Sequence, residues 1–173
     1  MTVRILGEGK YLRLYDDDGW EYVRRHGANG VVVIVAFTPD NRLVLVEQFR
    51  PAVKSRVIEL PAGLVGDVTD WQDESLATAA QRELVEETGY DADHFVRLAA
   101  GPTSVGLSSE TVTFFQAQGL RRVGTGGGDD TEDIVVHEVE LPTMRAWLDE
   151  KERQGCLVDP KIFAGICLSG QKC

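Results

Sequence analysis

The amino-acid sequence predicts an α+β fold, an α/β/α sandwich around a mixed β-sheet with an N-terminal β-hairpin. Three observations support this prediction: some segments are dense in β-branched residues, others have the apolar spacing of helices, and the two kinds do not alternate regularly. With 43% hydrophobic and 27% charged residues, the 173-residue chain has the composition of a globular protein with one main domain.

The first 28 residues are expected to form a hairpin extension, and residues 29–173 the main domain. Tyr11 to Tyr15 and Trp20 to Arg24 are short alternating segments, and the acidic sequence DDDG at 16–19 has the composition of a turn between paired strands. This turn lacks the alternating ligand spacing and the distal glutamate of a calcium loop. It is therefore interpreted as a plain turn.

Two buried strands are predicted at Gly30 to Phe37 and Leu43 to Phe49, where β-branched residues flank the turn sequence TPDN. A shorter strand, Val57 to Leu60, ends at the sequence PAG (61–63). A long polar loop is expected from there to about Asp73.

A helix is predicted to follow, because Leu76, Ala80 and Leu84 recur at helical spacing and Gly89 stands where a C-terminal cap glycine belongs. The glycine-rich stretch 124–130 is expected to be a mobile loop. Two further strands and two further helices are expected at Thr111 to Ala117 and Ile134 to Leu141, and at Thr143 to Gln154 and Pro160 to Leu168.

Composition and charge exclude several classes of function. The net charge of -10 argues against a nucleic-acid partner, which needs a clustered basic surface. No apolar run approaches the roughly 20 residues of a membrane span, and the first twenty residues lack a signal-peptide core, so the expected location is the cytoplasm. The three cysteines and three histidines have no zinc-binding spacing.

Three carboxylates lie within five residues of the predicted helix: Glu83, Glu86 and Glu87. Like charges at these spacings repel by a few tenths of a kcal/mol per pair. The helix dipole near the C-terminal end disfavours each of them by roughly 0.3–1 kcal/mol. Arg82 is placed to neutralise Glu86, and the remaining charge predicts a hard divalent cation, Mg²⁺ or Mn²⁺. The alternative is a solvated acidic face.

Glu74, seven intervening residues and then the segment RELVEETGY (82–90) resemble the Nudix box of the Nudix hydrolases. The family consensus begins with a glycine six residues before the first glutamate, where this chain has Val68. Gly63 is the plausible counterpart, which implies about five extra residues between Gly63 and Asp73.

The segments VLVEQFRP (44–51) and IELPAG (58–63) are similar to those preceding the box in ADP-ribose pyrophosphatase-like members. This resemblance implies that the Ala62 carbonyl, Glu83 and Glu87 ligate the metal. It implies that Glu86 ligates a further ion or holds Arg82. Glu86 and Arg82 are both expected to be part of the catalytic machinery. It also implies that Arg50 contacts the pyrophosphate.

The stretch 101–110 is similar to the loop that follows the box in these enzymes, although Val105 replaces a proline there. Glu110 is expected to hold metal or substrate, or to be part of a structural turn. Glu132 looks like the glutamate that assists the attacking water in the same family. Its rivals for this role are Asp129, Asp130 and Asp133.

The resemblance implies a Mg²⁺-dependent hydrolase that cleaves the pyrophosphate of a nucleoside diphosphate linked to a sugar, with ADP-ribose giving AMP and ribose 5-phosphate. The alternatives are a GDP-mannose or other nucleotide-sugar pyrophosphatase and a catalytically silent binding module. A homodimer is expected, in which the hairpin docks on the partner and Trp20 or Tyr11 stacks on the nucleotide base. The other possibility is a hairpin packed on its own domain with Trp20 in the core.

Overall fold

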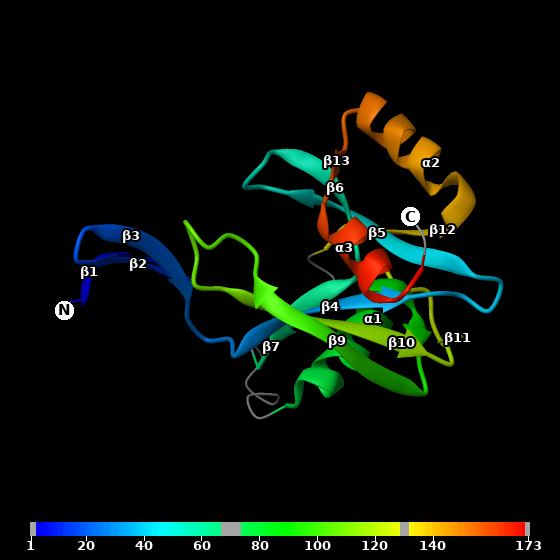
Figure 1. Cartoon of the computed structure of the whole chain (residues 1–173), viewed down its shortest axis with the longest axis horizontal. Helices are drawn as coiled ribbons and strands as arrows, with labels where there is room; N and C mark the ends of the chain where they lie inside the picture. The colour runs from blue at the N-terminus through cyan, green and yellow to red at the C-terminus, as the bar shows by residue number, and fades with distance from the viewer. Residues whose placement is uncertain (1–2, 67–73, 129–131, 172–173) are drawn as a thin grey trace.

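The protein was analysed as a computed structural model that describes residues 3–66, 74–128 and 132–171 (Figure 1). Its body contains two four-stranded sheets. The first has the strand order β7-β4-β10-β9, in which β10 runs parallel to β4 and the other neighbours are antiparallel. These strands are β4 (Gly30–Ala36), β7 (Ala62–Val65), β9 (His94–Pro102) and β10 (Thr111–Gln118).

The second sheet has the order β12-β5-β6-β13, in which β13 is parallel to β6 and the other pairs are antiparallel. Its strands are β5 (Arg42–Arg50), β6 (Ser55–Glu59), β12 (Val135–Glu140) and β13 (Leu157–Val158). The short strands β8 (Tyr90–Asp91) and β11 (Arg121–Arg122) form a separate pair. The body is therefore built on mixed sheets, as predicted.

Strand β4 is buried on both faces because helices cover both sides of its sheet. Successive side chains of a strand point to opposite faces. Accordingly, Val32 and Ile34 pack in the cluster that contains α1 (Leu76–Thr88), whereas Val33 and Val35 pack in the cluster that contains α2 (Leu141–Arg153) and α3 (Lys161–Leu168). This arrangement confirms the predicted α/β/α sandwich.

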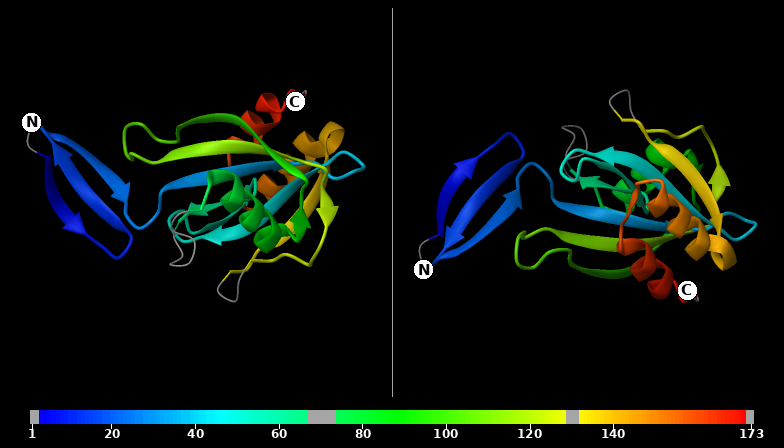
Figure 2. Two further views of the ribbon diagram at one scale, coloured as in Figure 1. Left: turned by 90° about the horizontal axis from the view of Figure 1, so that it is seen from below. Right: turned by 90° about the horizontal axis from the view of Figure 1, so that it is seen from above.

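The N-terminal segment forms a small sheet of its own, which projects from the body (Figure 2). The predicted hairpin is present as β2 (Leu12–Asp17) and β3 (Trp20–Arg25), joined by a turn with positive φ at Asp18 and Gly19. The additional strand β1 (Val3–Glu8) pairs with β2, so the extension has three strands instead of two.

Three sequence-based expectations differ from the structure. The loop expected from the sequence PAG (61–63) to about Asp73 is partly replaced by β7, which covers residues 62–65 and pairs with β4. Residues 67–73 of that stretch lie outside the described residues. Strand β9 was not predicted, because its sequence HFVRLAAGP combines mixed exposure with small residues that lack strong β-propensity. Strand β1 was missed because all six of its residues are exposed.

Both ends of α1 are capped. The Ser75 hydroxyl accepts a hydrogen bond from the Thr78 amide (3.1 Å), and Gly89 has the left-handed φ of 71° that the sequence predicted. None of the helices in the described ranges is long and apolar enough to cross a membrane.

Candidate active site

The acidic helix α1 packs Ala79, Ala80 and Leu84 into the core, and this fixes where its glutamates point. Glu83 and Glu87 lie toward β7 and the end of β5, whereas Glu86 is on the more exposed side, with 53% of its side chain accessible. The three box carboxylates thus occupy different environments.

Gly63 of β7 lies directly beneath the carboxyl group of Glu83. A Cβ atom added to Gly63 would be 1.8 Å from the Glu83 Cδ atom, far inside van der Waals contact. Only glycine allows this approach. The geometry agrees with the sequence-based assignment of Gly63 as the glycine that precedes the box.

Glu87 is the most buried of the box glutamates, with 4% of its surface exposed. The backbone N–H of Ala62 donates to its Oε2 at 3.0 Å. Burial, and then the negative charges of Glu83 and Glu132, raise the pKa of Glu87 well above its ordinary value, against the opposing effects of the Ala62 hydrogen bond and of Arg50. A cation bound beside this carboxyl group would favour its charged form.

Arg82 holds the glutamates of the site together. Its guanidinium donates to Glu74 (3.0 Å), Glu83 (2.9 Å) and Glu86 (3.1 Å), and to the Leu64 carbonyl (3.0 Å). Burial alone would lower the pKa of Arg82, but these ion pairs outweigh it and raise the pKa. One of the two roles expected for Glu86 was that of a partner for Arg82, and the two side chains are paired in this structure.

Arg50, at the end of β5, lies across from the box glutamates. Its Nε and Nη2 donate to the Glu59 Oε2 atom, at 2.9 and 2.6 Å, and Nε also donates to Oε1 at 3.2 Å. Burial alone would lower the pKa of Arg50, but Glu59, and then Glu87 and Glu132, raise it. The structure therefore brings Arg50 and Glu132 to the same place as Glu87.

Over its described residues, 124–128, the glycine-rich segment is docked on the C-terminal end of α1, where the sequence suggested a mobile loop. The amides of Gly127 and Gly128 donate to the carbonyls of Glu87 (2.8 Å) and Glu86 (3.0 Å), which the helix itself leaves without partners. Positive φ angles at 126–128 make this path possible only for glycine. Residues 129–131, including the rivals Asp129 and Asp130, lie outside the described residues.

Other expected site residues are placed elsewhere. Glu110 pairs with Arg25 of β3 (2.9 Å), and its amide donates to the Ser108 hydroxyl, so it joins the N-terminal sheet to a structural turn. Trp20 and Tyr11 are 62% and 59% exposed on the projecting sheet, so the alternative of Trp20 as a core residue of its own domain is wrong. Asp133 is engaged by Arg56, not by the box.

Sequence reasoning assigned no role to Glu59, although it anchors Arg50. The pairing of β5 with β6 could have indicated that Glu59 lies near Arg50. Glu59 pairs with Val46 across the two strands, so its side chain is on the same face as those of Gln48 and Arg50. Gln48 also donates to Glu59, at 3.2 Å.

The donor set fits a hard divalent cation. Glu83 and Glu87 supply carboxylates next to the backbone of Ala62, and Glu87 is buried there with 4% of its surface exposed. Over the described ranges, no three side chains of His, Cys, Asp or Glu form a ready-made ligand shell. Mg²⁺ does not need one, because it uses one or two carboxylates and completes its shell with water and substrate phosphate.

A sequence model of the NUDIX domain matches residues 28–155, which include all of these glutamates and Arg50. The chain belongs to the NUDIX family. Among its relatives in this family, it is 33% identical over 132 residues to the methanol dehydrogenase activator of Bacillus methanolicus, covering 76% of this chain and 67% of that protein.

Two further NUDIX relatives carry the names of hydrolases. The ADP-ribose pyrophosphatase of Mycobacterium tuberculosis is 39% identical over 141 residues (82% of this chain, 62% of that protein). The GDP-mannose pyrophosphatase of Salmonella arizonae is 33% identical over 141 residues (77% and 69%). The matched segments thus span about two thirds of the relatives' lengths.

The NUDIX fold is also shown by a solved structure described as an ADP compounds hydrolase. It matches with a TM-score of 0.72 at 21% identity, covering 98% of this chain and 90% of that chain.

Proposed function

We propose that this NUDIX chain hydrolyses the pyrophosphate bond of a nucleoside diphosphate linked to a sugar, and that ADP-ribose is its substrate, with AMP and ribose 5-phosphate as products. The observation that carries the proposal is the buried Glu87, which lies within reach of Glu83, Glu132 and Arg50. Negative and positive groups gathered in this way suit an anionic substrate that arrives with a divalent cation.

Glu83, Glu87 and the carbonyl of Ala62 would hold Mg²⁺, with Mn²⁺ as a substitute, and Glu86 would hold a further ion or keep its bond to Arg82. When bound, the cation supplies charge neutralisation at the pyrophosphate and orientation of the water. The ion pairs of Arg82 with Glu83 and Glu86 hold both carboxylates in position when substrate binds.

Arg50 and Glu132 have complementary roles in the proposed reaction. The guanidinium of Arg50, 43% exposed and oriented by Glu59, binds pyrophosphate oxygens. Glu132 takes the proton of the attacking water while a new P–O bond forms and the bond from that phosphorus to the bridging oxygen breaks. Asp133 is the weaker candidate for this base, because its carboxylate is paired with Arg56 at 2.9 Å.

GDP-mannose, or another nucleotide sugar, is the second candidate substrate. Val105 stands where ADP-ribose pyrophosphatase-like members carry a proline, and 77% of this chain is matched by a relative named GDP-mannose pyrophosphatase. The box determines the pyrophosphate chemistry but not the groups on either side of it.

The proposed enzyme works as a homodimer through its N-terminal sheet, with residues 1–28 as the docking extension. The registers of β1, β2 and β3 place Val3, Ile5, Tyr15, Trp20 and Tyr22 on one face of this sheet. An isolated small sheet is marginally stable in water, so a partner subunit that covers this face would stabilise it. Trp20 or Tyr11 would then stack on the base of the partner's nucleotide.

A substrate panel tests the function. The protein is incubated with ADP-ribose, GDP-mannose, other nucleoside diphosphate sugars, dinucleotides and dinucleoside polyphosphates, each with Mg²⁺ and with excess EDTA, and the products are identified by chromatography. We expect turnover of ADP-ribose to AMP and ribose 5-phosphate, abolished by EDTA. Preferred cleavage of GDP-mannose would select the second candidate. Binding without turnover would select the silent module, and full turnover in EDTA would refute the metal role.

A further inference from the structure

Arg56 of β6 holds the residue that follows Glu132. Its Nη1 donates to the Asp133 carboxylate at 2.9 Å, and its Nη2 donates to the Asp133 backbone carbonyl at 3.3 Å. Because the guanidinium is planar, these two bonds define both the position and the orientation of the chain there. The side chain of Asp133 is 84% exposed, and Arg56 is the partner that holds it among the described residues.

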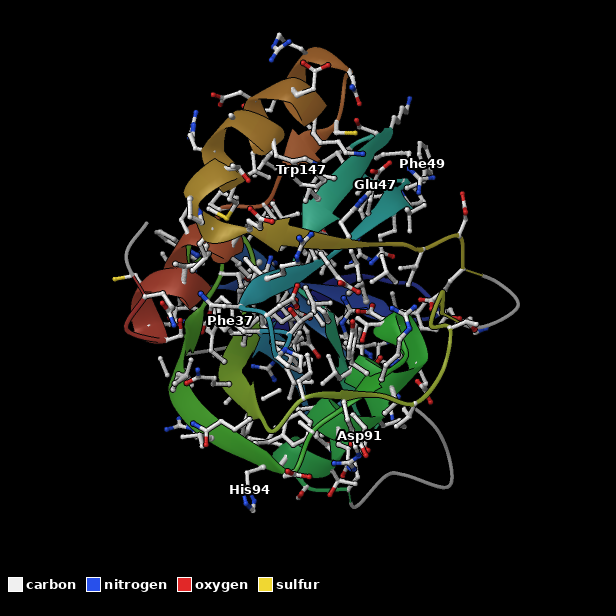
Figure 3. All side chains as sticks on the ribbon, turned by 90° about the vertical axis from the view of Figure 1, so that its right-hand side faces the viewer. Phe37, Glu47, Phe49, Asp91, His94 and Trp147 are labelled. Carbon is white, nitrogen blue, oxygen red and sulfur yellow. The ribbon has the colours of Figure 1, made fainter. Side chains whose placement is uncertain are left out.

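Arg56 is itself held in place by Glu47 of the neighbouring strand β5. Its Nε donates to the Glu47 carboxylate (2.7 Å) and its Nη2 to the Glu47 carbonyl (3.0 Å). Glu47 is 8% exposed and also accepts from His137 of β12 (2.9 Å) and Lys151 of α2 (2.7 Å). Figure 3 shows Glu47 on its strand beneath the helix that carries Trp147.

Glu132 is confined on its other side by Gly128. A Cβ atom on Gly128 would be 2.3 Å from the Glu132 Oε2 atom and 2.7 Å from its Cβ, so the glutamate packs directly on the glycine backbone. Gly128 in turn is bound to the end of α1 through the Glu86 carbonyl. Glu132 therefore lies between two held residues. One is Gly128, which is bonded to the end of α1, and the other is Asp133, which is bonded to Arg56.

From this arrangement we infer that Arg56 is a positioning residue: with Asp133, it holds Glu132 at the box glutamates. The inference rests on the proposed function, in which Glu132 acts as the base. A displacement of about 1 Å in a reacting group can cost about 10²-fold in rate. In this role Arg56 affects the reaction through Glu132, so its loss lowers kcat and leaves KM nearly unchanged.

The test is a double-mutant cycle of Arg56→Gln and Glu132→Gln, measured on the nucleoside diphosphate sugar that wild type turns over, with Mg²⁺. We expect Arg56→Gln to lower kcat about 10- to 10²-fold with KM changed less than about twofold. In the Glu132→Gln background the same change has no further effect, because the group it positions is absent. An equal loss in both backgrounds overturns the inference.

Two further variants control for folding. The two bonds from Arg56 to Asp133 form a clamp, and Asp133→Ala removes its carboxylate bond at an exposed position while keeping the bond to the backbone carbonyl and the Arg56–Glu47 pair. This variant is expected to lower kcat in the same direction as Arg56→Gln, by a smaller factor. Arg42→Gln breaks a more exposed side-chain bond, the 2.7 Å bond from Arg42 of β5 to Glu140 of β12 at the other end of the strands, and is expected to keep wild-type kcat. Equal losses in Arg42→Gln and Arg56→Gln would make the effect one of general stability.

Hydrogen exchange tests the clamp without any activity. Amides of residues 133–135 should exchange faster in Arg56→Gln and Asp133→Ala than in wild type or Arg42→Gln. Unchanged exchange overturns the clamp even if the enzyme is active. If wild type turns over no nucleotide sugar, the proposed function fails, and the exchange result alone then supports or overturns the clamp.

Discussion

Gly63 and Glu83 meet where the backbone of β7 passes under the carboxylate of the box helix. The contact needs the absence of a single carbon atom, since a Cβ would be 1.8 Å from the Glu83 Cδ. A substitution so small therefore tests whether the position of Glu83 matters.

We expect Gly63→Ala to lower kcat by about 10²-fold, because the Glu83 carboxylate must move by about 1 Å or more to make room. Overpacking should also cost about 1–3 kcal/mol in unfolding free energy. Both quantities are measured, by steady-state kinetics and by urea unfolding.

The matched control is Gly30→Ala at the start of β4, where a Cβ would lie 3.7 Å from Leu76, an ordinary contact. Gly30→Ala should keep the wild-type kcat. If Gly63→Ala has the same kcat and the same unfolding free energy as Gly30→Ala, the close approach of Gly63 to Glu83 affects neither activity nor stability.

At the scale of elements, Glu47 connects four parts of the fold: its own strand β5, Arg56 of β6, His137 of β12 and Lys151 of α2. Burial alone would raise the pKa of Glu47, but Lys151, His137 and Arg56 outweigh it and lower the pKa from 4.5 to about 2. The carboxylate is therefore more stable in the folded protein than in the unfolded chain.

A lowered carboxyl pKa stabilises the fold above pH 4.5, and this stabilisation is lost as the pH falls from 4.5 toward 2. We expect Glu47→Gln to lower the unfolding free energy at pH 7 by up to about 3 kcal/mol. The difference from wild type should shrink toward pH 2.5. Urea unfolding at pH 7, 5, 4 and 3 measures both effects.

Glu140→Gln is the control for a carboxylate in an exposed pair, with 52% of the Glu140 side chain accessible. It should change the unfolding free energy by less than about 1 kcal/mol at pH 7. A Glu47→Gln protein that loses stability between pH 5 and 3 as steeply as wild type would contradict the assignment.

In the whole molecule, the N-terminal sheet is joined to the body by few bonds. Val23 exchanges backbone hydrogen bonds with Leu107 and Ser109, and Arg25 pairs with Glu110. The sheet otherwise projects away from the body (Figure 2). Its aromatic face is thus presented to whatever docks against it, and the proposal assigns that place to a second copy of the chain.

We expect a dimeric mass in solution, and we expect Trp20→Ala to raise KM more than it lowers kcat, because contact with a base is the same in the ground state and the transition state. Light scattering gives the mass and steady-state kinetics give the two constants. Leu168→Ala, at an apolar residue that is 41% exposed on α3, should change neither. A monomeric mass together with an unchanged KM in Trp20→Ala would refute this arrangement.

The amino-acid sequence was enough to predict the fold class and the elements whose signals are local. The β-branched density of β4 and β5, the helical spacing and cap glycine of α1 and the acidic turn at 16–19 are all properties of neighbouring residues, and each of these elements formed as predicted. The box glutamates and Arg82 were singled out from residue types at set spacings, whereas Arg50 was proposed only from the resemblance of its segment to the family.

Tertiary structure decided the features that depend on residues far apart in the chain. Whether Glu87 is buried depends on β7, 25 positions earlier, and the place of Glu132 depends on Gly128 and on an arginine 77 positions before Asp133. The docking of the glycine-rich segment required carbonyls at the end of α1, so composition alone suggested mobility instead. A spacing rule describes one element, whereas these contacts arise only when several elements pack together.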